Sequence, residues 1–438
     1  MRRNLFAVIG VVALLAGSCH GGRSDSRRSS GSSGIELRNG QWFDGSGFRA
    51  RTMYVVGRSF SAARPSRVSS SVDLGGQWVV PPYAEAHNHW LEPDGIAAYD
   101  AMYLRAGVFY LKDMANAPVV RRRMDAALNR PTTVDFVSAN QGWTGPGGHP
   151  YQIALQFLKF GSFPKQWTEK DLDRNVVEVV SSPSDVEARW PEFLAGKPDF
   201  VKVFLLYSEE SAQRQADPKF LYQRGIDPAL VPLIAEKAHR AGLRVAAHAY
   251  SAADFRNALA GGADDIAHFP GTGWNAKLGD GAFRITSDDA ALAAKRGATV
   301  TTTLSWLGEE MEGDPKKANH IVDAVIRPNL DLLRRAGVTI LLGSDQFRQT
   351  PAGEAALLAR LKLFSNAELL RMWCTTTPRA IFPGRRIGRL EDGDEASLLV
   401  LTGDPIADFS NTARISMRMK QGAILPAPPD VRFPALPQ

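Results

Sequence analysis

Residues 227–248 read DPALVPLIAEKAHRAGLRVAAH and join a capped helix to an apolar strand. Asp227 is a favourable N-cap, residues 228–241 have helical spacing, and Gly242 is a favourable C-cap. Residues 243–248 then form a β-like run that ends in a histidine. The stretch therefore predicts one helix followed by one buried strand, which is the repeating unit of an α/β protein.

The same alternation extends in both directions along the chain. Apolar β-like runs separated by helical segments occur at residues 79–89, 108–113, 133–138, 200–206, 243–248, 265–268, 298–304 and 338–345. Near-continuous apolar strands interleaved with helices in this number predict a closed parallel (β/α)8 barrel of the TIM type. An open doubly wound sheet is the alternative fold.

The flanking segments have a different pattern from the barrel. Short β-like runs with turn signals precede it, and a similar pattern returns after about residue 384. We therefore predict a small β-sandwich domain built from both termini, residues 35–80 and 384–425. The catalytic barrel then spans residues 81–383, and a Pro-rich tail spans residues 426–438.

The first residues are typical of an export signal. Two arginines precede an apolar run over residues 5–16, which is too short to cross a membrane and suits the core of a signal peptide. We predict a signal peptide over residues 1–18 and a flexible polar tether over residues 19–34.

Residues 16–19, AGSC, resemble a bacterial lipobox, with Ala16 where leucine is usual. Such a motif implies that Cys19 is lipidated, and ordinary cleavage after Ser18 is the alternative. We therefore expect an exported protein that is periplasmic or anchored to the membrane through Cys19.

Composition excludes several classes of protein and of partner. The chain has 438 residues, 44% hydrophobic and 22% charged, which excludes disordered, collagenous and polytopic membrane proteins. Its net charge is +6, but five arginines lie within the first 28 residues, and without them the charge falls to +1. We expect a small-molecule substrate, no nucleic acid, and no membrane contact beyond a lipid anchor. Homo-oligomerisation is compatible with the sequence.

Several side chains suited to metal chemistry stand on the predicted barrel strands. His87 and His89 lie two residues apart near the end of the first strand, so both imidazoles can face the same side. Lys202 lies within the fourth strand, where a buried ammonium is costly unless it reaches a strand end, is partnered or is modified. His248 and His268 end the fifth and sixth strands.

Asp345 ends the eighth strand. By itself it could equally be the N-cap of the following helix. Active sites of barrels of this type lie at the carboxyl ends of the strands, where all of these residues are expected to meet.

These residues and their surroundings resemble the amidohydrolase superfamily of metal-dependent hydrolases over about residues 39–422. Residues 81–89, PPYAEAHNH, are similar to the opening motif of the family, with Glu85 where the family has Asp. Residues 375–380, TTTPRA, and 388–397, GRLEDGDEAS, are similar to its closing signature, with Ser397 where Asp is usual.

The resemblance implies two divalent metal ions held by six residues: His87, His89, Lys202, His248, His268 and Asp345. Lys202 would bridge them as a carbamate formed with carbon dioxide, and Asp345 would also transfer the proton as metal-bound hydroxide attacks a carbonyl carbon. Zinc suits such ligands best, and manganese, iron or cobalt are alternatives.

The dipeptidase- and imidazolonepropionase-like branch of the family supplies two substrate-binding predictions. His149, in GPGGHP at residues 145–150, resembles the G-G-H loop of the branch, and Tyr207 resembles its substrate-contacting tyrosine. The predicted function is cleavage of a C–N bond in a dipeptide or N-acyl amino acid. One alternative is lactone or ester hydrolysis at the same metals, and another is an inactive periplasmic binding lipoprotein.

Overall fold

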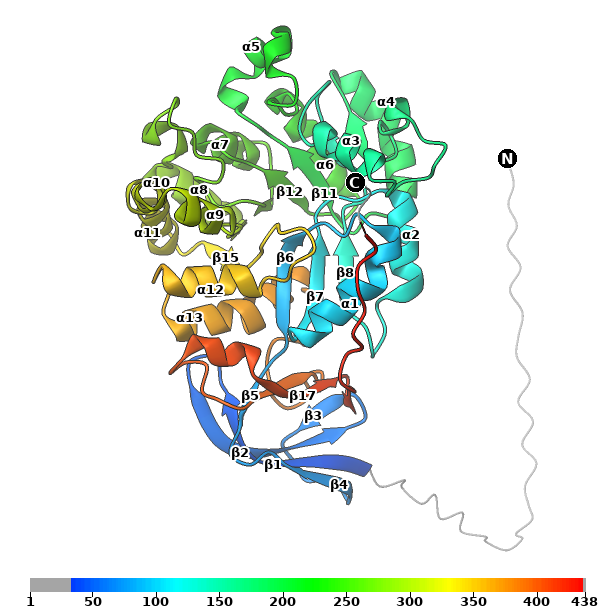
Figure 1. Cartoon of the computed structure of the whole chain (residues 1–438), viewed down its shortest axis with the longest axis vertical. Helices are drawn as coiled ribbons and strands as arrows, with labels where there is room; N and C mark the ends of the chain where they lie inside the picture. Colours follow the sequence, from blue (N-terminus) through cyan, green and yellow to red (C-terminus); the bar gives the residue numbers. More distant parts are fainter. Residues whose placement is uncertain (1–32, 436–438) are drawn as a thin grey trace, which may run out of the picture.

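The computed structural model describes residues 33–435. The predicted signal peptide, most of the predicted tether with Cys19, and residues 436–438 of the predicted tail lie outside this range. Figure 1 shows a β-rich part at one end of the molecule and a larger α/β part above it.

Both ends of the described chain contribute to one sheet, in the order β18-β17-β16-β5-β1-β2-β3, with β4 paired to β1. Its strands are β1 (Ser33–Phe43), β2 (Phe48–Val56), β3 (Ser59–Ser61), β4 (Arg67–Asp73), β5 (Trp78–Val80), β16 (Leu398–Leu401), β17 (Ile415–Lys420) and β18 (Ala423–Ile424). Strand β5 joins the two ends, because it pairs with β1 on one side and with β16 on the other. This arrangement is consistent with the predicted composite β domain.

The α/β part contains parallel strands in two sheets, ordered β6-β7-β8 and β10-β9-β11-β12-β13-β14-β15. Their bounds are β6 (Tyr83–Asn88), β7 (Val108–Asp113), β8 (Asp135–Ser138), β9 (Gly142–Thr144), β10 (Val177–Val179), β11 (Val201–Phe204), β12 (Val245–His248), β13 (Asp265–Ile266), β14 (Thr299–Thr301) and β15 (Thr339–Leu341). Each predicted barrel strand is present, whereas β9 and β10, each three residues long, were not predicted.

Backbone hydrogen bonds join β6 to the segment that follows β15. The amide of Ala86 donates to the carbonyl of Leu342 at 3.0 Å, and the amide of Asp345 donates to the carbonyl of His87 at 2.8 Å. The prediction is confirmed at the level of a TIM-barrel-like α/β fold. The structure does not show the closed barrel of the finer prediction, because the parallel strands divide between two sheets.

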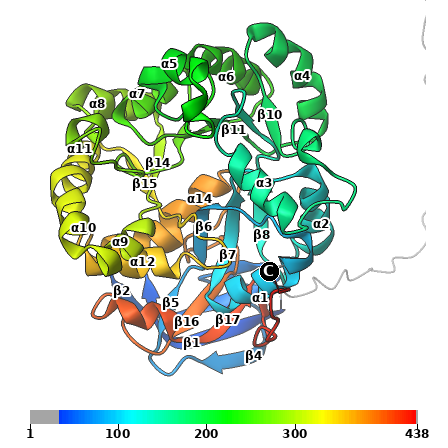
Figure 2. The same cartoon turned by 45° about the horizontal axis from the view of Figure 1, so that its top comes forward.

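Helices lie outside the parallel strands, as Figure 2 shows. They are α1 (Ile96–Arg105), α2 (Pro118–Ala127), α3 (Tyr151–Lys159), α4 (Pro183–Ala195), α5 (Ser211–Ala216), α6 (Val231–Arg240), α7 (Ala252–Ala260), α8 (Ser287–Arg296), α9 (Trp306–Gly313), α10 (Pro315–Ile321), α11 (Arg327–Arg335), α12 (Ala352–Arg360), α13 (Asn366–Arg371) and α14 (Thr377–Ile381). Within residues 33–435 no helix combines the length and apolarity needed to cross a membrane.

Residues 227–248 form the predicted helix and strand. The carboxylate of Asp227 accepts from the amide of Ala229 at 2.9 Å and starts a short 3-10 turn that leads into α6. Gly242 has φ +74°, a left-handed conformation that favours glycine after a helix. Strand β12 follows directly, so these local signals position His248 at its end.

Candidate metal centre

A cavity of about 240 Å³ lies at the carboxyl-terminal side of the parallel strands. Its lining contains all of the predicted metal ligands: His87, His89, Lys202, His248, His268 and Asp345. They lie on β6, β11 and β12 or directly after β6, β13 and β15. Residues far apart in sequence meet here because parallel strands bring their carboxyl ends to one face.

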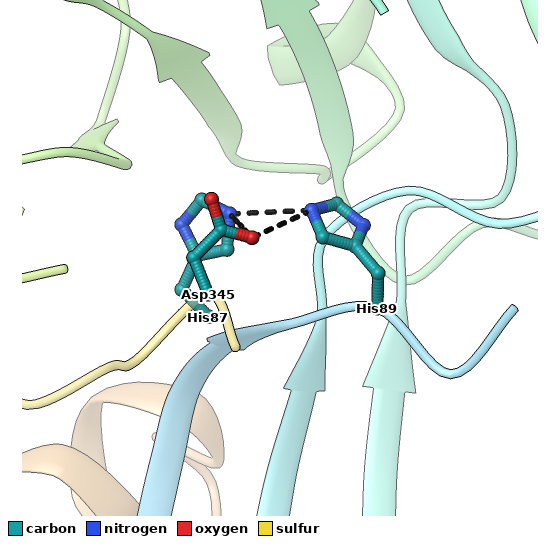
Figure 3. A group of neighbouring side chains, drawn as sticks. All are labelled: His87, His89 and Asp345. Carbon is teal, nitrogen blue, oxygen red and sulfur yellow. Dashed lines mark hydrogen bonds and ion pairs between the residues drawn. The ribbon is translucent and has the colours of Figure 1, made fainter. Parts of the chain in front are cut away.

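His87, His89 and Asp345 form the tightest group in the cavity (Figure 3). The Nε2 atoms of the two histidines are 3.3 Å apart, and they lie 3.5 and 3.4 Å from Oδ1 of Asp345. One ligand atom from each residue can be chosen so that all lie within 4.8 Å of one another. The Asp345 side chain is 37% exposed and faces the cavity, where water and substrate can reach it.

The hydrogen bonds of the two imidazoles define which nitrogen carries the proton. Nδ1 of His87 lies 2.7 Å from the carbonyl oxygen of Ala267, and Nδ1 of His89 lies 3.1 Å from that of Ala115. A carbonyl only accepts, so each Nδ1 carries the proton. Burial lowers the pKa of both rings below the ordinary value, which keeps them neutral.

The two Nε2 lone pairs therefore face each other and a carboxylate oxygen without a proton between them. Electron-pair donors this close repel unless a cation lies among them. The donor set of His87, His89 and Asp345 thus fits a divalent metal ion, and the Nδ1 bonds orient the rings for it.

Lys202, His248 and His268 lie beside this group. The ring centroids of His248 and His268 are 4.4 Å apart, and those of His87 and His268 are 4.6 Å apart. Lys202 is fully buried, and neither its Nζ nor Nε2 of His248 has a hydrogen-bond partner among the described residues. Burial lowers the pKa of Lys202 to about 7, so a much larger fraction of this amine is uncharged at neutral pH than of an exposed lysine.

Unsatisfied polar atoms at full burial are costly and rare in folded proteins. Here they point into the same cavity as the first group. Nδ1 of His268 lies 3.0 Å from Oγ1 of Thr303, which leaves Nε2 of His268 for a ligand. These residues fit a second cation or a modified lysine better than they fit an apolar core.

Glu85 connects the strand of the histidines to the loop of Asp345. Its carboxylate accepts from the amide and the hydroxyl of Ser344 at 2.8 and 2.6 Å, and from the amide of His87 at 3.0 Å. Burial raises the pKa of Glu85 to about 8, although these hydrogen bonds oppose the rise. Glu85 therefore holds His87 and Asp345 in register without lining the cavity.

Only one of the two predicted substrate-binding residues lines the cavity. His149 lines the cavity, with its ring centroid 4.5 Å from that of His248. Tyr207 is not among the lining residues, and its ring centre lies 4.1 Å from the guanidinium carbon of Arg214. The side-chain amide of Gln152 donates through Nε2 to Nδ1 of His149 at 3.0 Å, which leaves the ring proton of His149 on its Nε2.

Tyr250 is a cavity residue that the sequence reasoning missed. Its ring centroid is 4.5 Å from that of His248. It follows His248 by two residues, and side chains at that spacing share a face when a strand continues, so this signal could have indicated it. Phe347, two residues after Asp345, also lines the cavity and was missed as well, although its spacing from a predicted strand-end ligand is the same.

Comparisons with known proteins identify a similar family and similar folds. The sequence model of the amidohydrolase family matches residues 222–425 of this chain, which include His248, His268 and Asp345. No curated protein matches the chain. His87, His89 and Lys202 precede the matched part, so their assignment depends on the cavity itself.

Solved structures with a similar fold include ochratoxinase of A. niger, at 15% identity and TM-score 0.69, covering 90% of this chain and 96% of that chain. A Xaa-Pro dipeptidase with bound methionine has 17% identity and TM-score 0.63, covering 89% and 99%. Molinate hydrolase has 15% identity and TM-score 0.64, covering 90% and 95%. At such identities the likeness shows the fold alone.

The family match confirms the predicted resemblance to the amidohydrolase superfamily. With it, the prediction of an enzyme that hydrolyses C–N bonds is confirmed at the level of the family. The family generally uses divalent metals, and a candidate His/Asp site is present.

Proposed function

We propose that the protein is a metal-dependent hydrolase that cleaves the C–N bond of a small amide, a class that includes the dipeptides and N-acyl amino acids of the sequence prediction. The observation that carries the proposal is the group of His87, His89 and Asp345, in which unprotonated ligand atoms converge. A cavity of about 240 Å³ supports a small-molecule substrate rather than a folded protein.

His87, His89 and Asp345 would hold one metal ion, and His248 and His268 a second. Imidazole and carboxylate ligands in this number suit zinc, with manganese, iron or cobalt as alternatives. When bound, such ions lower the pKa of water and polarise a carbonyl group.

Lys202 would be carboxylated in the active protein. Its uncharged Nζ would bond to the carbon of carbon dioxide and lose a proton, which converts the amine into a carbamate with two oxygens and one negative charge. The buried Nζ without a partner supports this proposal, because a carbamate oxygen can bind a cation and an amine proton cannot.

Asp345 and His149 would move and hold the protons of the reaction. The carboxylate of Asp345 accepts a proton from the attacking water and returns it to the leaving nitrogen as the C–N bond breaks. Nε2–H of His149 donates to the carbonyl oxygen, whose negative charge grows in the transition state. The products are a carboxylic acid and an amine.

Metal analysis combined with a substrate screen tests the proposal. Purified protein should contain divalent metal, lose activity on chelation and regain it with zinc. Amides should be hydrolysed, whereas ester or lactone turnover faster by orders of magnitude would favour the alternative of an esterase or lactonase. A metal-loaded protein inert towards amides, esters and lactones would support a binding lipoprotein.

We also propose that the protein is exported and anchored through lipidated Cys19 or released after Ser18. The support is the sequence pattern of residues 1–19. Mass spectrometry of the mature N-terminus, with Cys19→Ser as the matched variant, distinguishes the two forms.

A further inference from the structure

Two chemically different sets of residues line the cavity. The first set, called the polar side here, consists of the predicted metal ligands and His149. The second set, called the apolar side, consists of Leu91, Ile153, Phe157, Phe163, Val177 and Phe347, which lie on α3, on β10 or in segments that connect the elements.

The apolar side is well packed. Helix α3 presents Ile153, Ala154 and Phe157 to the cavity, residues whose spacing places them on one face of the helix. The rings of Phe157 and Phe347 meet edge to face with centroids 4.9 Å apart. Phe157 is only 6% exposed, so its ring is held in place and forms a preformed surface for a flat or branched apolar group.

None of the described residues on the apolar side is a lysine or an arginine. Among the described residues that line the cavity, Lys202 is the one lysine or arginine, and it lies among the predicted metal ligands. A carboxylate on the apolar side would therefore have no cationic partner within the lining.

Arginines in segments next to the lining residues are bound to other groups. Arg348, adjacent to Phe347, donates through Nε to Glu92 at 2.9 Å and through Nη2 to the Pro434 carbonyl at 2.8 Å. Its Nη2 also contacts the other oxygen of Glu92. Neutralised in this way, Arg348 is poorly placed to bind a substrate anion.

The segment between β11 and α6 contains two further arginines, Arg214 on α5 and Arg224 after it. Arg224 donates to the backbone carbonyls of Pro146, Arg214 and Gln215 at 2.9, 2.8 and 3.0 Å. Arg214 is 5% exposed and donates to Glu210 at 2.9 Å and to the Gln223 carbonyl at 2.8 Å. Both guanidinium groups hold this segment together instead of facing a ligand.

We infer, on the basis of the proposed function, that the preferred substrate is an amide whose group facing the apolar side is uncharged and either aromatic or branched. A carboxylate placed there would lose its hydration without gaining a counter-charge. Dipeptides and N-acyl amino acids, which carry such a carboxylate, are then poorer substrates than otherwise identical uncharged amides.

A matched pair of amides tests this inference. N-acetyl-2-phenylethylamine is N-acetyl-L-phenylalanine without its carboxylate, so the scissile bond and the ring are the same. With the full zinc-loaded chain, kcat/KM should be roughly tenfold to a hundredfold higher for the uncharged amide, because its counterpart must bury an unpaired charge. Calorimetric titration of the metal-free chain, in which no turnover interferes, should show tighter binding of the uncharged amide.

A charge placed on the apolar side should alter the preference. Ile153→Lys puts an ammonium beside the substrate, so the ratio of the two kcat/KM values should move by about tenfold or more towards the acid. Gln156→Lys is the matched control, because Gln156 lies on the same helix but is exposed. It should leave the ratio unchanged, and thermal melts should verify that both variants fold.

Equal or faster hydrolysis of the acid by the unaltered chain would overturn this inference and leave the proposed function intact. Failure of the metal-loaded chain to hydrolyse any amide would instead overturn the proposed function. In that case calorimetry still decides the inference, since equal or tighter binding of the acid contradicts it.

Discussion

The carboxylate of Glu85 accepts hydrogen bonds from both the backbone amide and the side-chain hydroxyl of Ser344, at 2.8 and 2.6 Å. Ser344 directly precedes Asp345, and Glu85 also accepts from the amide of His87 at 3.0 Å. A single buried side chain thus couples two of the proposed metal ligands, although it lies outside the cavity lining.

Glu85→Ala should weaken both the fold and the metal site. It leaves buried donors of Ser344 and His87 without an acceptor, which costs about 1–3 kcal/mol of unfolding free energy. Loss of such an orienting partner should also lower metal affinity by roughly tenfold to a hundredfold. Denaturant unfolding and metal titration measure these effects, and Glu85→Asp should recover part of both. Unchanged metal affinity in the alanine variant would show that Glu85 does not position the ligands.

Lys202→Ala should lose bound metal and activity, because no other described side chain takes the place of the proposed bridging group. Small carboxylic acids such as acetate should partly restore both by supplying carboxylate oxygens in the space left by the lysine. Metal content and turnover, with and without acetate, measure this effect. Lys165→Ala, at an exposed position, is the control. Full metal content and rate in Lys202→Ala without acetate would exclude the bridging role.

Asp345→Asn should spare the fold and remove most of the turnover. Asp345 has φ +53°, a left-handed conformation that asparagine tolerates as well as aspartate. The amide cannot accept the proton from water, so kcat should fall by roughly a hundredfold to ten-thousandfold. Steady-state kinetics at saturating metal measure the loss, and a thermal melt serves as the control for folding. A turnover number close to that of the unaltered enzyme would refute the proton-transfer role.

A largely buried ion pair between β7 and β13 should make stability depend on pH in the acid range. Oδ2 of Asp265 lies 2.6 Å from Nζ of Lys112, and the hydroxyl of Thr299 donates to Oδ1 at 2.8 Å. Burial alone would raise the pKa of Asp265, but Lys112 and Thr299 outweigh it, and the pKa lies below its usual range. The stabilisation by this carboxylate is therefore fully present above the unfolded-state pKa of about 3.9 and is lost as the pH falls through the lower folded-state value.

Asp265→Asn tests this dependence. At pH 7 the variant should be less stable by about 1–3 kcal/mol, because the partly buried Lys112 loses its charged hydrogen-bond partner. The difference from the unaltered chain should stay constant down to about pH 5 and shrink below about pH 4. Denaturant unfolding of metal-free protein at several pH values measures it. A difference that grows on acidification would contradict the sign of the argument.

Local sequence signals predicted much of the fold. Asp227 and Gly242 bound the helical segment before β12, and the apolar runs locate each strand from β6 to β15 apart from the short β9 and β10. Capping and apolar patterning act over a few residues, so they can be recognised without the rest of the chain. Closure of the strands depends on pairing between distant segments, which such patterns do not contain.

The candidate site was predicted unevenly for the same reason. The H-x-H pair and the histidines at strand ends carry chemistry that is unusual at buried positions, and the structure brings them to one cavity. His149 reaches this cavity, whereas Tyr207 packs against Arg214 instead. The resemblance used to select Tyr207 concerned its distance from Lys202 along the chain, and the direction of a loop side chain depends on its tertiary contacts.

The sequence by itself determined the alternation of strands and helices, because this pattern depends on residue type and short spacing. Through its resemblance to the amidohydrolase superfamily, the sequence also indicated the candidate metal ligands. Only the tertiary structure decided that the Nε2 atoms of His87 and His89 face one another. It also decided that Glu85 links His87 to the loop of Asp345, and that Arg348 is already paired with Glu92. Each of these features arises between segments distant along the chain, where proton positions and charge pairing are set by contacts that exist only after folding.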